Sequence, residues 1–546
     1  MSKTLTLIII SFVFISFAAY SQVISPYVYG ENSWMPKTIG TYSSGGDMDK
    51  QWGKVKDCGI KFIRVGGSAN DRNLPTDAQL VALVDSIRKI GAEPLLQVPY
   101  NIGSFTETTA ANMVRYVNIT MGRNVKYWSI ANEPNLYSGY TSTLIAAYFK
   151  RFATAMKLVD PTIKIVGPDL SSLVTGFYSS LIGGVDDITG KDTNGNYYLD
   201  IVSFHCYRGY SGSQTRANVT TDAPAKFIID VTSLTGWMNT ANTKNSRTGD
   251  AKLNWAVTEF NVNYLNPTTN DAAGVGSHGF LNGQYWAECL GYSMQYSAFA
   301  FAPWSIHESS GNRTTYDLGF LDGANGQYPR SSYYHLQLMA KNNKTNFAAS
   351  SDNQTLVKVV STKDATGTTV LVLNQELTTA FTYTVRLDLS AATGTSALKI
   401  NVDKGLAVQY TPTIQIPAQG THVLLFDNLG NIQKILEYTL TDTQNQTPPR
   451  VIYAGTVSAI SENKMDTKNL RIYSNQGGVN FDFSELKIQG SFQFKIFNLS
   501  GQIINSNVLQ SGTPNLTVSK DELRPGVYIS SVQSGLTTIR RKFLSL

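Results

Sequence analysis

The sequence predicts an α/β protein in which a (β/α)8 TIM barrel is followed by two small β domains. Three observations support this prediction. Short apolar runs alternate with helical patterns over roughly the first 335 residues, all seven tryptophans lie before residue 305, and the rest of the chain is rich in Thr, Ser, Asn, Val and Gly. The length of 546 residues is also too great for one ordinary domain.

Eight apolar runs have the length and composition of barrel strands. They are Tyr27–Gly30, Lys61–Val65, Pro94–Val98, Val125–Ala131, Ile163–Gly167, Asp200–His205, Asn254–Phe260 and Phe299–Trp304. Between them, Ala78–Ile90 and Leu144–Val159 carry apolar residues three or four positions apart, which favours helices. Repeated strand and helix units are typical of a (β/α)8 barrel, which we place at residues 22–338. A doubly wound sheet is the alternative, but the glycine-rich loop that usually follows its first strand is not found.

The chain after the barrel favours strands. Five runs, broken by Gly, Asn and Asp, predict a small antiparallel β-sandwich at residues 339–436. They are Thr355–Ser361, Thr368–Asn374, Thr382–Leu387, Leu398–Val402 and His422–Phe426. Residues 437–468 are polar and contain Thr447-Pro448-Pro449, so we predict a linker there. Strands and turns alternate again over residues 469–546, which predicts a third, β-rich domain.

Residues 1–21 have the pattern of an export signal. The start is positively charged, Leu5–Ala19 is apolar, and the small residues Ala19 and Ser21 precede an expected cleavage before Gln22. A membrane anchor is the alternative, but the stretch is short for a span and no basic stop follows it. No later segment is long and apolar enough to cross a bilayer, so we expect an exported mature protein with no stable membrane span.

The composition excludes several classes of function. The net charge of +6 is modest for this length and is no sign of nucleic-acid binding. The three cysteines, Cys58, Cys206 and Cys289, are odd in number and widely spaced, which indicates no disulfide framework. No Cys/His cluster has the spacing of a metal site, so we expect neither a metal nor another cofactor.

One segment, Asp192–Asp200, alternates acidic and amide residues as a calcium-binding loop does. It lacks the glycine expected at the sixth position, where Tyr197 stands. A turn at Asn194-Gly195 is the simpler interpretation.

Two strings suggest the chemistry: Trp-Ser-Ile-Ala-Asn-Glu-Pro-Asn at 128–135 and Trp-Ala-Val-Thr-Glu-Phe-Asn at 255–261. Each is an apolar run that ends in a glutamate, Glu133 or Glu259, beside amide side chains. Because the carboxyl ends of barrel strands meet at one mouth, we expect these glutamates to face each other. Two carboxylates on separate strands are what glycoside hydrolysis needs. A salt-bridged pair at the edge of a loop is the alternative interpretation.

The motifs Asn132-Glu133-Pro134 and Thr258-Glu259-Phe260-Asn261 resemble those of the clan A glycoside hydrolases, which are retaining enzymes with a (β/α)8 barrel. The resemblance covers about residues 25–430. It implies that Glu133 is the acid/base, which must carry a proton, and that Glu259 is the nucleophile, which must be ionised. Retention requires carboxyl groups about 5–5.5 Å apart, and inversion about 6.5–9.5 Å.

Five further residues are candidates for binding the sugar or supporting the glutamates. Asn132 is suited to bond the sugar 2-hydroxyl, and Arg64 ends the second strand, where a cation would keep Glu259 ionised. His205 and Tyr207 end the sixth strand, and Trp304 ends the eighth as a possible stacking platform. In the clan, an arginine commonly stands at the second position and a histidine or tyrosine at the sixth. A barrel-rim ion pair for Arg64, a structural role for His205 and core packing for Trp304 are the alternatives.

Five residues are weaker candidates: Trp34, His278, Trp286, His307 and Glu308. Among these, Glu308 is a third carboxylate close to Trp304 in sequence, but no strand pattern leads directly into it.

The C-terminal residues 469–546 resemble the type A sorting domain of the Bacteroidetes type IX secretion system. The matching pieces are Leu470–Tyr473, Ile496–Gly501, Leu523–Ile529 and the basic end Thr538–Phe543. The usual proline-rich start is replaced by Ser474-Asn-Gln. A carbohydrate-binding sandwich is the alternative, although it would lack tryptophans. The resemblance implies the type IX secretion machinery as a partner, export through the periplasm, and a secreted or cell-surface protein.

These observations predict a secreted retaining glycoside hydrolase that cleaves β-glycosidic bonds in a polysaccharide by double displacement. Endo action is favoured because exported enzymes cut chains too large to import. The motifs resemble most the xylosidase-like and endoglucanase-like families, and xylan, glucan, mannan and galactan all stay open as substrates. The alternatives are a non-catalytic surface carbohydrate-binding protein on a glycosidase-like barrel and a structural adhesin, which only the β-rich C-terminal part favours.

Overall fold

A computed structural model describes most of the chain beyond the predicted export signal. The described residues are 22–33, 51–68, 75–100, 105–208, 214–308, 317–322, 328–390, 397–454, 470–475, 477–486, 490–498, 502–534 and 537–545. The export signal at 1–21 and the weaker candidate Trp34 lie outside them. The chain divides into two compact units, Met1–Ala454 and Gly455–Leu546. None of the described helices combines the length and apolar character that crossing a bilayer requires.

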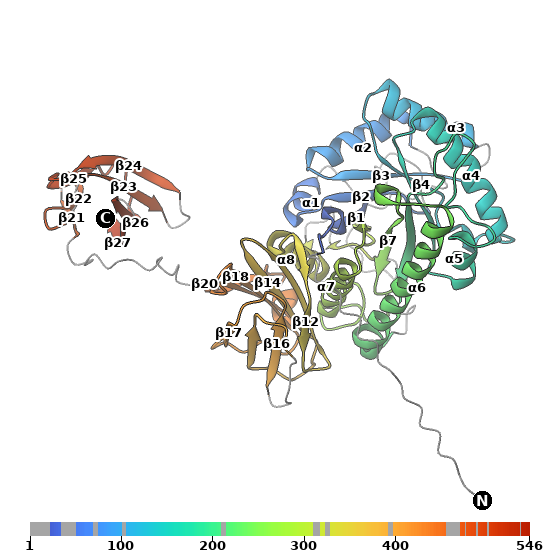
Figure 1. Ribbon diagram of the computed structural model, residues 1–546. Helices are drawn as coiled ribbons and strands as arrows, with labels where there is room; N and C mark the ends of the chain where they lie inside the picture. Colours follow the sequence, from blue (N-terminus) through green and yellow to red (C-terminus); the bar gives the residue numbers. More distant parts are fainter. Residues whose placement is uncertain are drawn as a thin grey trace, which may run out of the picture. The chain divides into compact units, whose positions relative to one another are not determined.

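Eight parallel strands, adjacent in sequence order, form the predicted barrel (Figure 1). They are β1 (Gly30–Ser33), β2 (Phe62–Val65), β3 (Glu93–Val98), β4 (Tyr127–Ile130), β5 (Lys164–Leu170), β6 (Ile201–Tyr207), β7 (Asn254–Asn261) and β8 (Ala300–Phe301). Backbone hydrogen bonds from Asn32 N to Pro303 O and from Ile306 N to Asn32 O, both 3.0 Å, join β1 to the segment after β8. The barrel is therefore nearly closed, as the sequence predicts.

Helices surround this sheet (Figure 1). They are α1 (Trp52–Cys58), α2 (Asp77–Lys89), α3 (Glu107–Val114), α4 (Ser142–Val159), α5 (Thr175–Leu181), α6 (Ala223–Lys244), α7 (Phe280–Gln295) and α8 (Ser331–Asn342). Helix α2 shows why they form: a capping box of Thr76 and Gln79 satisfies its first N–H groups, and Leu80, Val84 and Ile87 are buried. The two predicted helices correspond to α2 and α4.

The interior of the barrel changes from apolar to polar toward the carboxyl ends of the strands. An apolar layer fills the lower part: Phe62, Leu95, Tyr127, Val166, Ile201, Ala256 and Ala300. Because side chains on a strand point to the same face every second residue, the next inward positions on five of these seven strands are polar: Arg64, Gln97, Ser129, Ser203 and Thr258, all buried. The apolar layer thus supports a polar layer beneath the mouth.

The first and the last predicted barrel strands are displaced or shortened in the structure. The run Tyr27–Gly30 begins instead as a 3-10 turn, Pro26–Val28, and β1 starts only at Gly30. The fixed φ of Pro26 and a hydrogen bond from Tyr27 N to the Ser25 hydroxyl favour this turn. Strand β8 is limited to Ala300–Phe301.

The second domain is a β-sandwich next to α7 and α8 (Figure 1). One sheet has the order β11 (Asn346–Ala348), β13 (Val357–Asp364), β14 (Gly367–Asn374), β18 (Gly420–Asp427), β19 (Ile432–Thr439) and β20 (Arg450–Ala454). The other has the order β12 (Ser350–Asp352), β16 (Leu398–Val402), β15 (Tyr383–Arg386) and β17 (Gln409–Tyr410). Residues of both sheets, such as Val372 and Ile400, share one core. All pairings are antiparallel except that of β15 with β16.

The predicted linker at 437–468 is wrong in its first part, because residues 437–454 complete the sandwich. Strand β19 runs to Thr439, helix α9 (Leu440–Gln444) follows with a capping box, and β20 pairs with β19. Arg450 binds both Glu437 and Asp442, which ties β20 to this turn. The prolines lie just before an edge strand, where a missing N–H costs no ladder bond. The predicted boundary at 338/339 falls inside α8.

The C-terminal unit contains two further sheets. One has the order β21 (Arg471–Asn475), β22 (Gly478–Asp482) and β25 (Asn515–Val518). The other has the order β24 (Ile503–Gln510), β23 (Ser491–Asn498), β26 (Gly526–Ser534) and β27 (Thr537–Ser545). Phe481 packs on Phe494 and Phe543, with ring centroids 4.7 and 5.1 Å apart, so the two sheets share an aromatic core.

Candidate active site

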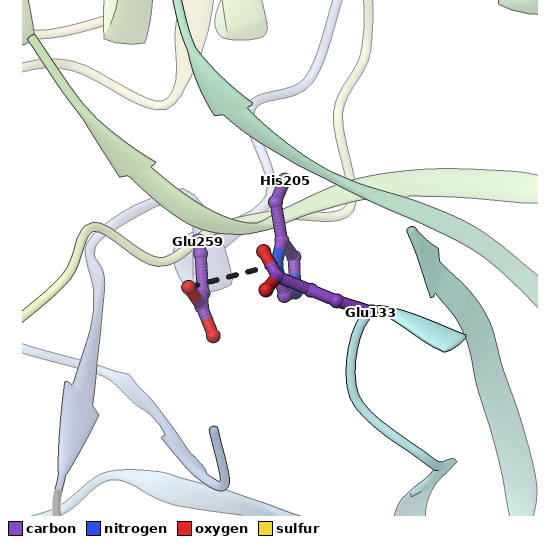
Figure 2. Close-up of side chains that lie close together, drawn as sticks. All are labelled: Glu133, His205 and Glu259. Atoms are coloured by element: carbon purple, nitrogen blue, oxygen red, sulfur yellow. Dashed lines mark hydrogen bonds and ion pairs between the residues drawn. The ribbon is translucent and has the colours of Figure 1, made fainter. Parts of the chain in front are cut away.

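The two glutamates that the sequence singled out lie together at the mouth of the barrel (Figure 2). Glu133 follows β4 and caps a 3-10 turn, and Glu259 lies in β7. One carboxylate oxygen of each glutamate and a ring nitrogen of His205 all lie within 4.8 Å of one another. The side chain of Glu133 is 21 % exposed and that of Glu259 is 8 % exposed. The fold therefore brings together two carboxylates, of which Glu133 is the more exposed to solvent.

The backbone around Glu133 has an unusual conformation that orients this residue. The φ angles of Ala131 and Glu133 are +68° and +46°, in the left-handed region that residues with a Cβ rarely adopt. A hydrogen bond of 2.9 Å from Glu133 N to Asp169 O holds this turn against the end of β5. Strained backbone of this kind persists only where surrounding contacts over-determine it, and it clusters at functional sites.

Arg64 organises the polar layer beneath both glutamates. Its side chain is fully buried, and its Nη1 donates to Glu259 Oε1 at 2.8 Å and to Asn32 Oδ1 at 3.0 Å. Its Nη2 donates to Asn132 Oδ1 at 2.9 Å and lies 3.3 Å from Asp169 Oδ2. Burial alone would lower the pKa of Arg64, but the carboxylates of Asp169 and Glu259 raise it above its usual value. The guanidinium stays charged and balances buried negative charge.

Two residues of this layer, Asn32 and Asp169, were not among the sequence candidates. Asn32 Nδ2 donates to Thr258 O at 2.8 Å and to Ala302 O at 2.7 Å, which ties β1 to β7 and to the chain after β8. Asp169 accepts hydrogen bonds from Thr258 Oγ1 at 2.6 Å and from the Ser203 hydroxyl. Each of these two residues lies just beyond the predicted end of its strand. A polar residue at such a position was therefore the signal in the sequence that could have identified it as part of the site.

His205 lies between the two glutamates. Its Nδ1 is 2.8 Å from Glu133 Oε1 and 3.5 Å from Glu259 Oε2 (Figure 2). Burial alone would lower the pKa of His205, but the charges of Glu259 and Glu133 raise it. The pairing of β6 with β7 shifts register between Phe204 and His205, directly before the residue that carries the imidazole.

Tyr207 and Asn132 complete the contacts to the pair. Tyr207 Oη donates to Glu259 Oε2 at 2.7 Å. Burial, followed by the nearby carboxylates, raises the pKa of Tyr207 well above its usual value, so the phenol stays a donor. Asn132 is buried next to Glu133, and its Oδ1 is held by Arg64.

Trp304 lies beside the same network. Its backbone N donates to Phe260 O at 2.9 Å, and its carbonyl accepts from Asn261 Nδ2 at 2.6 Å. The peptide bond from Trp304 to Ser305 is cis. The indole Nε1 donates to Glu308 Oε1 at 2.6 Å, so Glu308, a weaker candidate, is in contact with the predicted platform.

The other weaker candidates lie in buried surroundings. Trp286 packs on Phe260 in the core, with its Nε1 3.4 Å from Asn261 Oδ1. His307 is also buried. His278 lies between Asp317 Oδ2, 3.6 Å from Nε2, and Asp322 Oδ2, 3.8 Å from Nδ1. Neither histidine contacts Glu133 or Glu259 in any of the hydrogen bonds or ion pairs between described residues.

Two groups of described residues bring potential metal ligands within 4.8 Å of one another. They are Glu133, His205 and Glu259, and His278, Asp317 and Asp322. Arg64 already binds Glu259, and Arg330 binds Asp317 at 2.6 Å, so a metal would meet a second cation in either place. The geometry therefore fits two ion-pair networks better than two metal sites.

The calcium-like segment forms a turn in which protein donors use the acidic oxygens. Asp192 Oδ1 accepts hydrogen bonds of 2.9 Å from the backbone N atoms of Asn194 and Asn196. The carboxylate of Asp200 binds Lys157 Nζ at 2.6 Å and Ile165 N at 2.9 Å. This agrees with the simpler interpretation of the sequence as a turn.

Comparisons with known proteins agree with the C-terminal prediction. Residues 471–545 match the family model of the secretion system C-terminal sorting domain. This match confirms the predicted sorting domain, in place of a carbohydrate-binding sandwich, and indicates a secreted or cell-surface protein. A search of curated proteins found no match to the chain.

Solved structures resemble the barrel and the sandwich together. CelM2, a bifunctional glucanase-xylanase from a metagenome library, has a TM-score of 0.54 at 13 % identity and covers 74 % of this chain and 96 % of its own. A family 51 α-L-arabinofuranosidase from Bifidobacterium longum has a TM-score of 0.51 at 15 % identity, covering 73 % and 95 %. A family 44 xyloglucanase from Paenibacillus polymyxa has a TM-score of 0.50 at 14 % identity, covering 74 % and 96 %. The chain shares the fold of these glycoside hydrolases.

Proposed function

We propose that this protein is a secreted retaining glycoside hydrolase that cleaves β-glycosidic bonds in a polysaccharide by double displacement. In this proposal the enzyme is endo-acting, so it cuts bonds in the interior of the polysaccharide. The observation that carries the proposal is the approach of Glu133 and Glu259 oxygens to within 4.8 Å at the barrel mouth. An upper limit of 4.8 Å between these oxygens agrees better with the carboxyl groups about 5–5.5 Å apart in retaining enzymes than with the roughly 6.5–9.5 Å of inverting ones.

The contacts of Glu259 support its role as the nucleophile. Arg64 and Tyr207 each donate a hydrogen bond to it, at 2.8 and 2.7 Å, and the guanidinium stabilises its negative charge. In the first step, Glu259 attacks the anomeric carbon while the bond to the leaving oxygen breaks. The product is a glycosyl ester of Glu259, as retention requires.

The contacts of Glu133 support its role as acid and base. His205 Nδ1 binds Glu133 Oε1, which leaves Oε2 as the oxygen that can carry the transferable proton. Glu133 gives this proton to the leaving oxygen in the first step. Formation of the ester removes the negative charge of Glu259. Glu133 then takes a proton from the water that attacks the anomeric carbon. The ester bond between the anomeric carbon and Glu259 breaks in this second step, which frees the Glu259 carboxylate and leaves Glu133 protonated again.

Location and fold support the proposed substrate class. The sorting domain indicates an exported protein, and exported hydrolases act on chains too large to import. The similar structures carry the names glucanase-xylanase, xyloglucanase and α-L-arabinofuranosidase. We therefore propose glucans and xylans as the first polysaccharides to test, followed by mannans and galactans.

The test combines substrate screening with chemical rescue. We expect the full chain to release oligosaccharides whose first-formed anomer is β, as read by NMR. Glu259→Ala should lower kcat by about 10⁴-fold or more, and azide should restore turnover of an activated aryl glycoside as the α-glycosyl azide. Glu133→Ala with azide should give the β-glycosyl azide instead. In this variant Glu259 still forms the glycosyl ester with inversion, and azide then displaces the ester with a second inversion.

Three results would contradict this proposal. A first-formed α anomer would exclude retention, and unchanged turnover in Glu259→Ala would exclude this nucleophile. A wild-type protein that binds polysaccharide but releases no product would favour the non-catalytic carbohydrate-binding alternative.

A further inference from the structure

Glu308 is a buried carboxylate to which the steps above give no role. Its Oε1 accepts the hydrogen bond of 2.6 Å from Trp304 Nε1, and its Oε2 accepts one from Leu318 N. The residue is only 8 % exposed. Both oxygens therefore face N–H donors, one on the aromatic side chain and one on the loop after β8.

The backbone of Trp304 and one edge of its ring have further contacts. Its backbone is tied to Phe260 and Asn261, the two residues after Glu259. The ring edge rests on Gly67, where an added Cβ would lie 2.5 Å from Trp304 Cη2. Gly67 N in turn donates to Gln97 Oε1 at 2.7 Å. The hydrogen bond to Glu308 adds a directional contact at the indole nitrogen, which constrains the plane of the ring.

Leu318 is itself firmly placed. Its carbonyl accepts from Asn261 Nδ2 at 3.0 Å. The preceding Asp317 is buried and receives two hydrogen bonds from Arg330, of 2.6 and 3.1 Å. The network of Arg330 and Asp317 therefore holds the N–H that fixes the second oxygen of Glu308.

We propose that Glu308 is a positioning residue of the candidate active site, which holds the indole plane of Trp304 beside Glu259 through the hydrogen bond to Nε1. This inference rests on the proposed glycosidase function, in which the ring of the sugar attached to Glu259 would stack on the indole. Carbohydrate faces stack on aromatic rings through their apolar C–H groups, so the tilt of the ring sets the tilt of the sugar. Reacting atoms must be aligned for attack, and a displacement of about 1 Å can cost 10²-fold in rate.

The protonation state of Glu308 gives the proposal an independent readout. Burial raises the pKa of Glu308 to about 8, against the hydrogen bonds from Leu318 and Trp304. The other charged or titratable groups that act on it or are affected by it are Asp317, Arg330 and Tyr207. Ionised, the carboxylate accepts both N–H groups. Protonated, its hydroxyl would face an N–H donor, and one of the two hydrogen bonds is lost.

The experiment uses the full chain labelled with ¹⁵N-tryptophan, in which Trp304→Phe identifies the Trp304 indole signal. We expect this signal to move upfield in Glu308→Gln, since a neutral amide is a weaker acceptor than a carboxylate. In the wild type it should titrate with a midpoint near pH 8, close to the raised pKa of Glu308. On the preferred polysaccharide, kcat/KM should fall about threefold to tenfold in Glu308→Gln and further in Glu308→Ala, with the larger part in kcat.

Glu288→Gln is the matched control, because Glu288 is also a buried carboxyl held by two side-chain donors, Tyr292 and Gln375. It should leave both the Trp304 signal and kcat/KM unchanged. If Glu308→Ala does not fold, Glu308→Gln alone decides. An unmoved indole signal, or an unchanged kcat/KM in a folded Glu308→Gln, would overturn the role of Glu308 and leave the proposed function intact. A wild type without hydrolytic activity would instead refute the proposed function.

Discussion

Two buried networks of this protein have almost the same composition but differ in access. At the barrel mouth, Arg64 pairs with Asp169 and Glu259, and His205 lies between Glu259 and Glu133. In the loops after β7 and β8, Arg330 pairs with Asp317 and Asp322, and His278 lies between those two carboxylates. Each network has one arginine, one histidine and at least two carboxylates.

The difference lies in exposure and in the state of the histidine. The side chain of Glu133 is 21 % exposed, whereas those of Asp317 and Asp322 are 2 % and 12 % exposed. The pKa of His205 is raised by its carboxylates, but that of His278 is lowered, mainly by burial and also by Arg330. Composition alone therefore does not define an active site, since a reactive carboxylate also needs a path to the substrate.

The largest expected difference between the networks is in catalysis. Glu133→Gln should lower kcat/KM on polysaccharide by about 10²- to 10⁴-fold, because it removes the proton donor and acceptor. Asp322→Asn, the equivalent change in the second network, should lower it less than threefold. Activity on one polysaccharide at one pH measures both, and equal losses would show that the second network also takes part in the reaction.

The next difference separates stability from activity. Arg64→Met and Arg330→Met each leave buried carboxylates without their cation, so each should lower the free energy of unfolding of the barrel by about 3–5 kcal/mol. Urea unfolding followed by tryptophan fluorescence reports this, because all seven tryptophans lie before residue 305. Under conditions where both variants stay folded, Arg64→Met should lose far more activity, since Arg64 donates to Glu259, whereas Arg330 pairs with Asp317 and Asp322. A stable Arg64→Met variant would contradict the charge-balance argument.

Much of the first network was predictable from the sequence, and the second was not. Glu133, Glu259, Arg64, His205 and Tyr207 all lie at the ends of apolar runs, and barrel strands carry such positions to one mouth. The second network joins two irregular loops, where no periodic pattern indicates which side chains meet. Its partners could be identified only after the loops were placed in space.

The residues missed within the first network had specific causes. The first strand was predicted as Tyr27–Gly30, which stops before Asn32, whereas the chain up to Val28 forms a turn and β1 runs from Gly30 to Ser33. The fifth was predicted as Ile163–Gly167, which stops directly before Pro168, a residue seldom found inside a sheet. Strand β5 instead continues to Leu170, and a register shift between Pro168 and Leu170 accompanies the placement of Asp169 in the network. The linker error has a similar origin, because two prolines lie next to an edge strand.

The smallest expected effect is on stability: the contributions of His205 and His278 to the stability of the fold should change with pH in opposite directions. The pKa of His205 is raised on folding, so its stabilisation is complete below the unfolded pKa of about 6.5 and is lost as the pH rises through the folded value. The pKa of His278 is lowered, so its stabilisation is present above about pH 6.5 and is lost as the pH falls through the folded value.

Replacement by glutamine tests these signs, because it removes the titration while keeping a polar side chain of similar reach. Relative to the wild type, His205→Gln should lose more Tm at pH 5 than at pH 9, and His278→Gln should lose more at pH 9 than at pH 5. Comparing the loss of Tm at the two pH values cancels the part of the loss that does not depend on pH, which is the cost of removing a buried imidazole ring. If both variants shifted in the same direction with pH, the two networks would not hold their histidines in opposite states, and the electrostatic distinction between them would fail.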